Sequence, residues 1–169
     1  KEAKKAGADC IKFQIHNLEN EMLKQTPQSD NFKESLWDTL ERTNFNIEQQ
    51  KKLMSECKKN NIDYLCTPFS KIGSDELESI GVELYKVGSG DLLNYLLLRR
   101  LAHTKKPIIL STGMSSFDEI HSAVSFLKDF KNPIKLLQCT SKYPTEPNDW
   151  GFNVIQELKD KFKLPVGFS

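Results

Sequence analysis

Long apolar runs are absent from this 169-residue sequence, and so is a large excess of charge of either sign. No stretch approaches the roughly 20 consecutive apolar residues that a bilayer-spanning helix needs. Lysine and arginine together number 24 against 23 aspartates and glutamates, which gives a net charge of +1. The bulk charge therefore indicates neither a nucleic-acid partner nor a membrane surface. The length is sufficient for one domain with a real core.

Cysteine is scarce, and common cofactor-binding motifs are missing. The four cysteines lie far apart without a CxxC pair, so we interpret them as reduced thiols of a cytoplasmic protein. The alternatives for them are disulfides or zinc ligands. The sequence has no GxGxxG turn, which disfavours a Rossmann fold, and no Walker loop, which disfavours a nucleotide ligand.

Six short apolar runs alternate with amphipathic helical patterns. The runs turn polar only at their carboxyl ends, as strands buried on both faces do; they are Ala8–Gln14, Asp63–Phe69, Glu83–Ser89, Pro107–Gly113, Ile134–Ser141 and Pro165–Ser169. Helices are expected from Asn46 to Asn61, from Ser74 to near Gly81, from Asn94 to Thr104, from Ser116 onward and from Val154 to Phe162. This alternation predicts a parallel α/β fold. We interpret residues 1–169 as an incomplete TIM (β/α)8 barrel, about strands 2 to 7, cut at both ends from a larger domain.

The segment from Ile15 to Phe45 interrupts this rhythm. It is far longer than a usual βα loop, so we interpret it as an active-site insertion. It contains His16, Asn31 and Trp37. Trp37 falls on an apolar stripe with helical spacing, which favours a place in the core. For His16 the sequence favours a solvated loop position.

Polar side chains collect at the carboxyl ends of the expected strands, where parallel barrels place their active sites. At one such end, Tyr85–Asp91, a cation, a hydroxyl and a carboxylate meet a glycine turn, although Lys86 and Asp91 could instead form a structural ion pair. The lysines and hydroxyls suit a doubly anionic ligand such as a phosphorylated carboxylic acid; they are Lys12, Thr67, Lys86, Ser89 and Ser111. The remaining groups suit a polyhydroxylated or amide-bearing ligand; they are Gln14, Asn31, Asp91 and Tyr143.

Six motifs lie in register along nearly the whole chain: Lys12–Gln14, Thr67–Ser70, Tyr85–Asp91, Pro107–Met114, Cys139–Pro144 and Pro165–Ser169. Their order and spacing resemble those of the sialic acid synthases, which are the N-acetylneuraminate and legionaminate synthases of the NeuB type. Each motif alone is weak, but six in register are specific.

The resemblance implies an enzyme, a transferase that condenses phosphoenolpyruvate with N-acetylmannosamine or a related 2-acetamido sugar. The products would be a nine-carbon sialic acid and phosphate. The positions that match the family's phosphoenolpyruvate-binding residues are Lys12, Thr67, Lys86, Ser89, Ser111 and Ser169. Those that match its sugar-binding residues are Gln14, Asn31, Asp91 and Tyr143. Asp91, as acid or base, and Lys86 are the expected catalytic residues.

The resemblance also implies parts that this chain does not contain. The family's Mn2+ or Mg2+ is held by histidines that would follow residue 169, so we expect no metal ligand within the chain. A C-terminal antifreeze-like domain and a homodimer are implied as well. We therefore expect the isolated segment to be inactive.

Two other functions remain open from the residues alone. One is a Schiff-base aldolase or lyase on the same barrel, with Lys86 or Lys12 as the nucleophile, because burial can depress a lysine pKa enough for imine chemistry. The other is a non-catalytic module that binds a sugar phosphate. The register of the six motifs favours the synthase over both.

Overall fold

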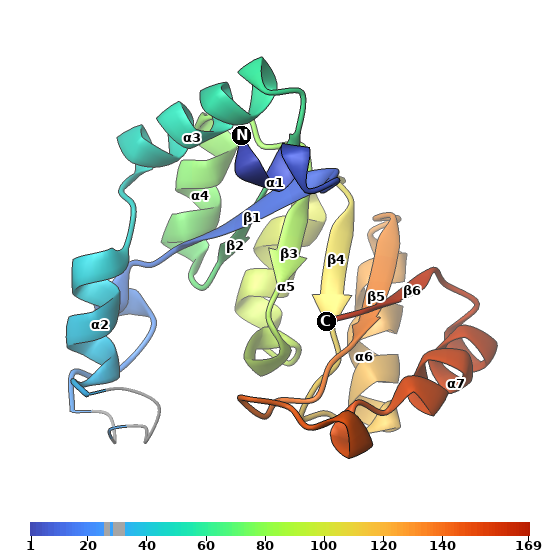
Figure 1. The fold of residues 1–169 in the computed structure, drawn as a ribbon. Coiled ribbons are helices and arrows are strands. Elements are labelled where there is room, and N and C mark those ends of the chain that lie inside the picture. Colours follow the sequence, from blue (N-terminus) through green and yellow to red (C-terminus); the bar gives the residue numbers. More distant parts are fainter. Residues whose placement is uncertain (26–27, 29–32) are drawn as a thin grey trace. The chain divides into compact units, whose positions relative to one another are not determined.

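A computed structural model describes residues 1–25, 28 and 33–169 of the chain. The chain divides into two compact units, residues 1–82 and 83–169. Each unit contains parallel strands connected through helices (Figure 1). Among the described residues, no helix has both the length and the apolar character that crossing a bilayer requires.

The first unit contains one pair of strands. Its elements are α1 (Glu2–Lys5), β1 (Cys10–Ile15), a 3-10 turn η1 (Leu18–Asn20), α2 (Leu36–Thr43), α3 (Ile47–Lys59), β2 (Asp63–Pro68) and α4 (Lys71–Ser79). In the parallel register of β1 and β2, Gln14 lies opposite Thr67. Side chains alternate along a strand, so Lys12 projects to the same face as these two residues. The other face carries Phe13, whose ring stacks on Tyr64 with centroids 5.6 Å apart.

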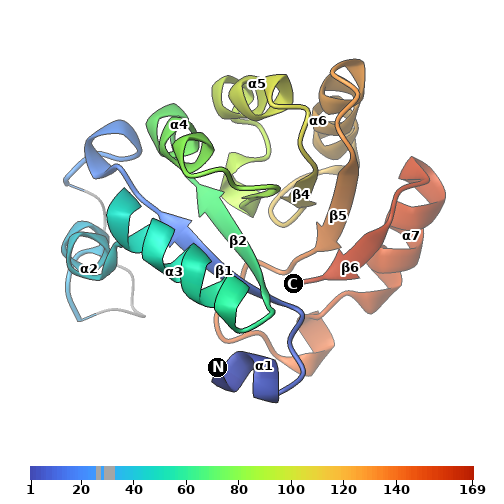
Figure 2. The same ribbon diagram turned by 90° about the horizontal axis from the view of Figure 1, so that it is seen from above.

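The second unit contains four parallel strands in chain order. Its elements are β3 (Tyr85–Val87), η2 (Ser89–Asp91), α5 (Tyr95–His103), β4 (Ile108–Ser111), α6 (Phe117–Asp129), β5 (Ile134–Gln138), η3 (Pro147–Asp149), α7 (Phe152–Phe162) and β6 (Val166–Phe168). β3 pairs with β4, β4 with β5 and β5 with β6. Figure 2 shows α5, α6 and α7 on the same side of these strands.

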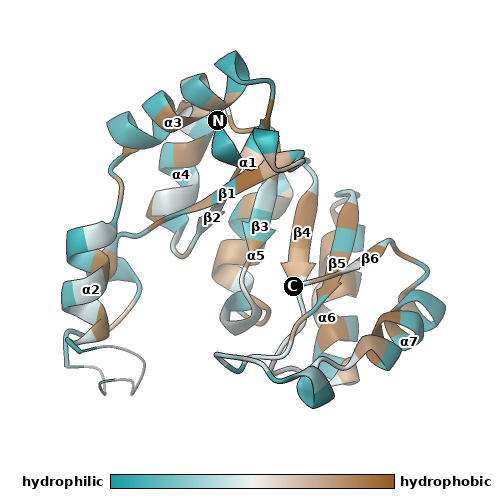
Figure 3. Ribbon diagram, in the orientation of Figure 1, coloured by the Kyte–Doolittle hydropathy of each residue, from teal (hydrophilic) through white to brown (hydrophobic). Residues whose placement is uncertain are grey.

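The core of the second unit lies between its strands and these helices. It contains leucines that are at most 1% exposed: Leu97, Leu98, Leu101, Leu110, Leu127, Leu136 and Leu158. Burying each leucine contributes about 1.5–3 kcal/mol relative to leaving it exposed. Figure 3 shows the apolar character of β4.

The opposite strand face of this unit carries polar residues. Lys86 lies opposite Ile109 in the register of β3 and β4, and Ile109 lies opposite Lys135 of β5. Ser111 follows two residues after Ile109 and therefore projects to the same face. The sequence thus separates an apolar face under the helices from a face that bears the predicted anion-binding groups.

Most of the helices begin where the sequence predicts. Asn46 and Ser116 cap α3 and α6 as predicted, each within a capping box. The predicted start of α4 at Ser74 is wrong: the helix begins at Lys71, because the Ser70 side chain accepts a backbone hydrogen bond from the first turn and caps it. Helix α7 likewise begins two residues earlier than predicted.

Candidate active site

A buried lysine lies in the middle of the short strand β3. Lys86 is 6% exposed, and its Nζ donates hydrogen bonds to Oγ of Ser111 at 2.5 Å and to the carbonyl of Val87 at 2.8 Å. A buried ammonium group requires such partners, because desolvation without them is costly. The structure therefore brings two predicted anion-binding residues from neighbouring strands into direct contact.

Ser89 and Gly113 form a second contact between the same two strand ends. The backbone N–H of Gly113 donates to Oγ of Ser89 at 3.1 Å, which leaves the Ser89 hydroxyl hydrogen to donate to another oxygen. A Cβ at residue 113 would lie 2.6 Å from Oγ of Ser141, 2.8 Å from Oγ of Ser89 and 2.9 Å from the Cys139 carbonyl. Only glycine allows this close approach of backbone and hydroxyls.

Asp91 lies at the end of η2 and is partly buried. Its Oδ1 accepts a hydrogen bond from Nδ2 of Asn94 at 3.1 Å. The side chain of Asn94 also accepts the backbone N–H of Leu97 at 3.2 Å and so caps α5. The carboxylate is thus tied to the first turn of a helix, where negative charge is favoured.

Two further predicted residues of this unit are more exposed. The side chain of Tyr143 is 86% exposed on the loop after β5. The backbone N–H of Ser169 donates to the Gln138 carbonyl at 2.8 Å and extends the pairing of β5 with β6. The register therefore places Ser169 at the carboxyl end of its strand, as predicted.

The first unit brings three predicted residues to one strand face. Thr67 is 3% exposed, whereas Lys12 and Gln14 are exposed on the same face. The carbonyl of Gln14 accepts a hydrogen bond from Nε2 of the fully buried Gln50 at 2.6 Å, and Oε1 of Gln50 accepts the Tyr64 hydroxyl at 2.6 Å. Asn31, the remaining predicted sugar-binding residue, lies outside the described residues.

His16 departs from the sequence expectation. The sequence favoured a solvated loop position, but the side chain is buried, with Nδ1 2.8 Å from Oε2 of the buried Glu21. Trp37, by contrast, is buried in α2 as predicted, at 4% exposure. The partner of His16 is five residues further along the chain, and no motif in the sequence marks the pair.

Three of the four cysteines are not activated as nucleophiles. All four are free. Cys66, in β2, lies beside Tyr64, and burial raises the pKa of its thiol to about 11. The pKa of the Cys10 and Cys57 thiols is also raised, chiefly by burial. These thiols therefore remain protonated near neutral pH.

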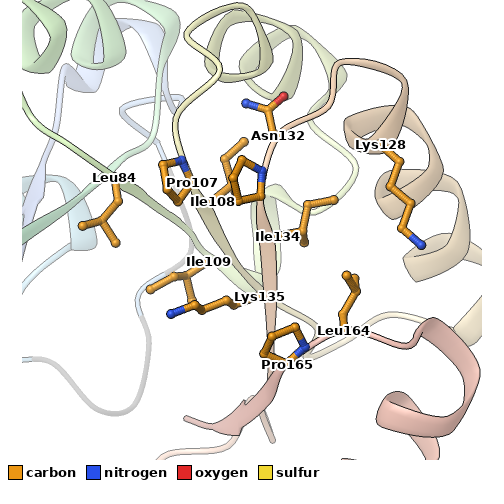
Figure 4. A pocket seen from close by; sticks show the side chains of 11 residues that line it. Leu84, Pro107, Ile108, Ile109, Lys128, Asn132, Ile134, Lys135, Leu164 and Pro165 are labelled. Carbon is orange, nitrogen blue, oxygen red and sulfur yellow. The ribbon is translucent and has the colours of Figure 1, made fainter.

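A cavity of about 470 Å3 lies at the other end of the strands in the second unit (Figure 4). Apolar side chains form most of its lining, including Pro107, Ile109, Ile134, Leu164 and Pro165. The cavity borders the amino ends of β4 and β5, and its described lining includes none of the predicted site residues of this unit. We therefore do not assign it to the candidate active site.

The described residues do not fit a metal ion. No group of three or more His, Cys, Asp or Glu side chains in residues 1–25, 28 and 33–169 is arranged to hold one. Within those residues, the predicted site positions of each unit supply cationic, hydroxyl, amide and carboxylate groups and no metal-binding cluster. Three contributors were not singled out as site residues from the sequence: Gly113, Asn94 and Glu21. Gly113 lies within the Pro107–Met114 motif and Asn94 begins a predicted helix. Their contacts with Ser89 and Asp91 become visible only in the folded structure.

Parallel strands connected through helices, with polar groups at the carboxyl ends, define the class as parallel α/β, the arrangement from which (β/α)8 barrels are built. Comparison with known proteins makes the assignment specific. The model of the NeuB family matches residues 1–169, and the chain belongs to the NeuB family.

Relatives and a solved structure agree with this assignment. The chain is 41% identical over its whole length to the uncharacterized protein MJ1065 of Methanocaldococcus jannaschii, of which it covers 48%. It is 35% identical to the N,N'-diacetyllegionaminic acid synthase of Campylobacter jejuni over 97% of this chain and 52% of that protein. The crystal structure of N-acetylneuraminic acid (sialic acid) synthetase from Leptospira borgpetersenii, in complex with citrate, matches with a TM-score of 0.87 and 35% identity. That match covers 99% of this chain and 56% of the other.

The fold class predicted from the sequence is thereby confirmed. The chain spans about half the length of the curated relatives it matches.

Proposed function

We propose that this chain is part of a synthase that condenses phosphoenolpyruvate with N-acetylmannosamine or a related 2-acetamido sugar. Carbon 3 of phosphoenolpyruvate forms a bond to the aldehyde carbon of the sugar, water adds at carbon 2, and the carbon 2–oxygen bond breaks to release phosphate. The product is a nine-carbon 2-keto-3-deoxy acid such as N-acetylneuraminate or legionaminate. Membership of the NeuB family supports this reaction, as do the names of two similar proteins, a legionaminic acid synthase and a sialic acid synthetase.

The anion-binding part of the proposal rests on the contacts of Lys86 and Ser89. The Lys86 ammonium group is buried beside Ser111, where the low local dielectric strengthens its attraction for a carboxylate or phosphate. The Ser89 hydroxyl accepts from Gly113 and can donate to a ligand oxygen. Lys12, Thr67 and Ser169 complete the proposed set of phosphoenolpyruvate ligands.

The sugar-binding part consists of Gln14, Asn31, Asp91 and Tyr143. Amide and phenol groups pair with the acetamido group and hydroxyls of such a sugar. Asp91 is the proposed acid or base and would move a proton at the reacting oxygen of the sugar. Its hydrogen bond from Asn94 holds the carboxylate in place for that step.

The proposal extends to components beyond this chain. We propose Mn2+ or Mg2+ as the cofactor, bound by residues beyond position 169, and a cytoplasmic homodimer as the complete protein. The segment 1–169 alone is proposed to be inactive.

The experiment must separate the synthase from an imine-forming lyase on the same fold. A longer form of the protein, as long as its relatives, is incubated with phosphoenolpyruvate, N-acetylmannosamine and Mn2+. Parallel samples are treated with borohydride. We expect phosphate release that requires both substrates, and no covalent adduct at Lys86 or Lys12. A reduced adduct without phosphate release would establish the lyase, and binding without turnover would establish a binding module.

A further inference from the structure

A buried histidine stands beside one of the proposed sugar ligands. His16 follows the end of β1 and is 9% exposed. We propose that His16 is a positioning residue, held by Glu21 and Phe69, that sets the orientation of the Gln14 side-chain amide toward an acetamido sugar. The inference rests on the proposed function, because that function makes Gln14 a sugar ligand.

Glu21 holds the imidazole ring from one side. Nδ1 of His16 lies 2.8 Å from Oε2 of Glu21, and the side chains are 7% and 3% exposed. The second carboxylate oxygen accepts the backbone N–H of Asn17 at 2.5 Å. A carboxylate at Nδ1 requires a proton on that nitrogen, so Nε2 is the atom left to engage a partner on the other side of the ring.

Phe69 and Asn44 hold the ring and the backbone of His16. The imidazole stacks on the Phe69 ring with centroids 4.4 Å apart and an angle of 14° between the planes. Oδ1 of Asn44 accepts the His16 backbone N–H at 3.0 Å, while Nδ2 of Asn44 donates to its carbonyl at 2.7 Å. With ring and backbone both fixed, the direction of Nε2 is fixed as well.

Nε2 of His16 points at Gln14. It lies 3.5 Å from the side-chain Oε1 of Gln14, which is longer than a typical hydrogen bond. With the proton on Nδ1, Nε2 of a neutral ring accepts, so pairing requires the Gln14 amide to turn its NH2 group toward Nε2. The Gln14 backbone is itself anchored by Gln50, so the exposed amide is the part of Gln14 that keeps rotational freedom. An amide has one donor end and one acceptor end. The end that His16 engages leaves the other end to pair with the acetamido group or a hydroxyl of the sugar.

A purely structural histidine would behave differently. Loss of loop packing alone would weaken the binding of both substrates. Phe69 follows Thr67, a proposed phosphoenolpyruvate ligand, whereas Gln14 is a proposed sugar ligand. A positioning role instead acts through Gln14 and is confined to the sugar. The two roles therefore predict different kinetics.

The test is a double-mutant cycle in the protein at the length of its relatives. His16→Gln keeps a donor for Glu21 and is expected to raise the KM for N-acetylmannosamine about tenfold, the effect of losing roughly one hydrogen bond. The KM for phosphoenolpyruvate stays within about twofold. In a Gln14→Ala background, His16→Gln adds no further change. A matched control, His121→Gln on the exposed surface of α6, leaves both constants unchanged.

Equal increases in both KM values, or additive effects in the double variant, would overturn the proposal. A second measurement needs neither turnover nor a folded His16 variant. In imidazole 15N spectra of the ligand-free protein, Gln14→Ala is expected to shift the Nε2 resonance of His16 and to leave its Nδ1 resonance unchanged. An unchanged Nε2 resonance would also overturn the proposal. If the wild-type protein releases no phosphate, the proposed function fails, while the spectra still decide whether His16 engages Gln14.

Discussion

The proposed anion binding should depend most on Lys86, whose ammonium group is buried. We predict that Lys86→Met raises the KM for phosphoenolpyruvate by about 10- to 100-fold, because a hydrogen bond to a charged group contributes roughly 1.5–3 kcal/mol. Its effect on kcat should be smaller. Steady-state kinetics with each substrate varied in turn provide the measurement. Lys135→Met is the control, since Lys135 projects from the same strand face near the amino end of β5; an equal effect there would mean that general charge, and not this site, attracts the substrate.

Asp91 follows the same strand and is the proposed acid or base on the sugar side of the site. We predict that Asp91→Asn lowers kcat by about 10²- to 10⁴-fold, as loss of a general acid or base does, and leaves the KM for phosphoenolpyruvate nearly unchanged. Asp118→Asn, at an exposed position in α6, serves as the control for a lost carboxylate. If Asp91→Asn instead raises that KM and spares kcat, the two sides of the site have been assigned in reverse.

Gly113 is required for steric reasons. We predict that Gly113→Ala lowers the free energy of unfolding by about 1–3 kcal/mol, because the new methyl group would meet two hydroxyls and a backbone carbonyl within 3 Å. Urea unfolding of the variant gives the value. Gly90→Ala is the matched control: its Cβ would meet only Met114 at 4.0 Å, so stability should hold or rise by up to about 1 kcal/mol. Equal losses for both variants would contradict the crowding argument.

At the residue scale, the sequence predicted the polar groups but not their partners. Lys86 and Ser111 could be named because polar residues at the end of buried strands stand out in the pattern. The pair formed by His16 and Glu21 could not be recognised, since neither residue lies on a periodic pattern and the His16 ring packs on Phe69, which lies in a distant segment of the chain. A solvated loop was therefore the wrong expectation for His16.

At the element scale, the capping box of α6 offers a separable test. We predict that Ser116→Ala lowers the free energy of unfolding by about 1 kcal/mol, because the helix loses the side chain that accepts the Glu119 backbone N–H. Ser122→Ala, at an exposed position within the same helix, should be close to neutral. Thermal or denaturant unfolding of the two variants provides the measurement. An equal loss of stability in both variants would show that the capping box is not the cause.

The same capping box predicts that the free energy of unfolding depends on pH. Hydrogen bonds from the backbone and side chain of Ser116 lower the pKa of Glu119. A folded-state pKa below the unfolded value, about 4.3 for glutamate, stabilises the fold at higher pH, and this contribution disappears as the pH falls through the folded-state pKa. Glu119→Gln keeps the capping geometry without the charge. Its stability deficit relative to wild type should be present at pH 7 and shrink on acidification; a constant deficit would contradict this account.

Element starts were predictable where one strong cap stands alone. Asn46 and Ser116 each precede a helical pattern with a matching third residue, and both caps form. At α4 two serines compete. The sequence favoured Ser74 because carboxylates follow it, whereas Ser70 caps the helix, and Ser74 lies inside it with its hydroxyl bonded to the carbonyl of Lys71.

At the scale of the whole molecule, the fold class followed from the sequence because buried strands and amphipathic helices alternate. The division into two compact units did not follow, since it depends on contacts between elements. We predict that the 169-residue segment alone releases no phosphate from phosphoenolpyruvate, N-acetylmannosamine and Mn2+, because its relatives are about twice as long. The longer protein in the same assay is the control. Phosphate release by the segment would contradict the prediction.

The most direct test of the central claim follows the oxygen atom that joins carbon 2 of phosphoenolpyruvate to phosphorus. The protein at the length of its relatives is given phosphoenolpyruvate labelled with 18O at that position, together with N-acetylmannosamine and Mn2+. Condensation with carbon–oxygen cleavage predicts that the label appears in phosphate, in an amount equal to the nine-carbon acid formed. Label retained in the keto acid, or pyruvate formed without the sugar, would contradict the account.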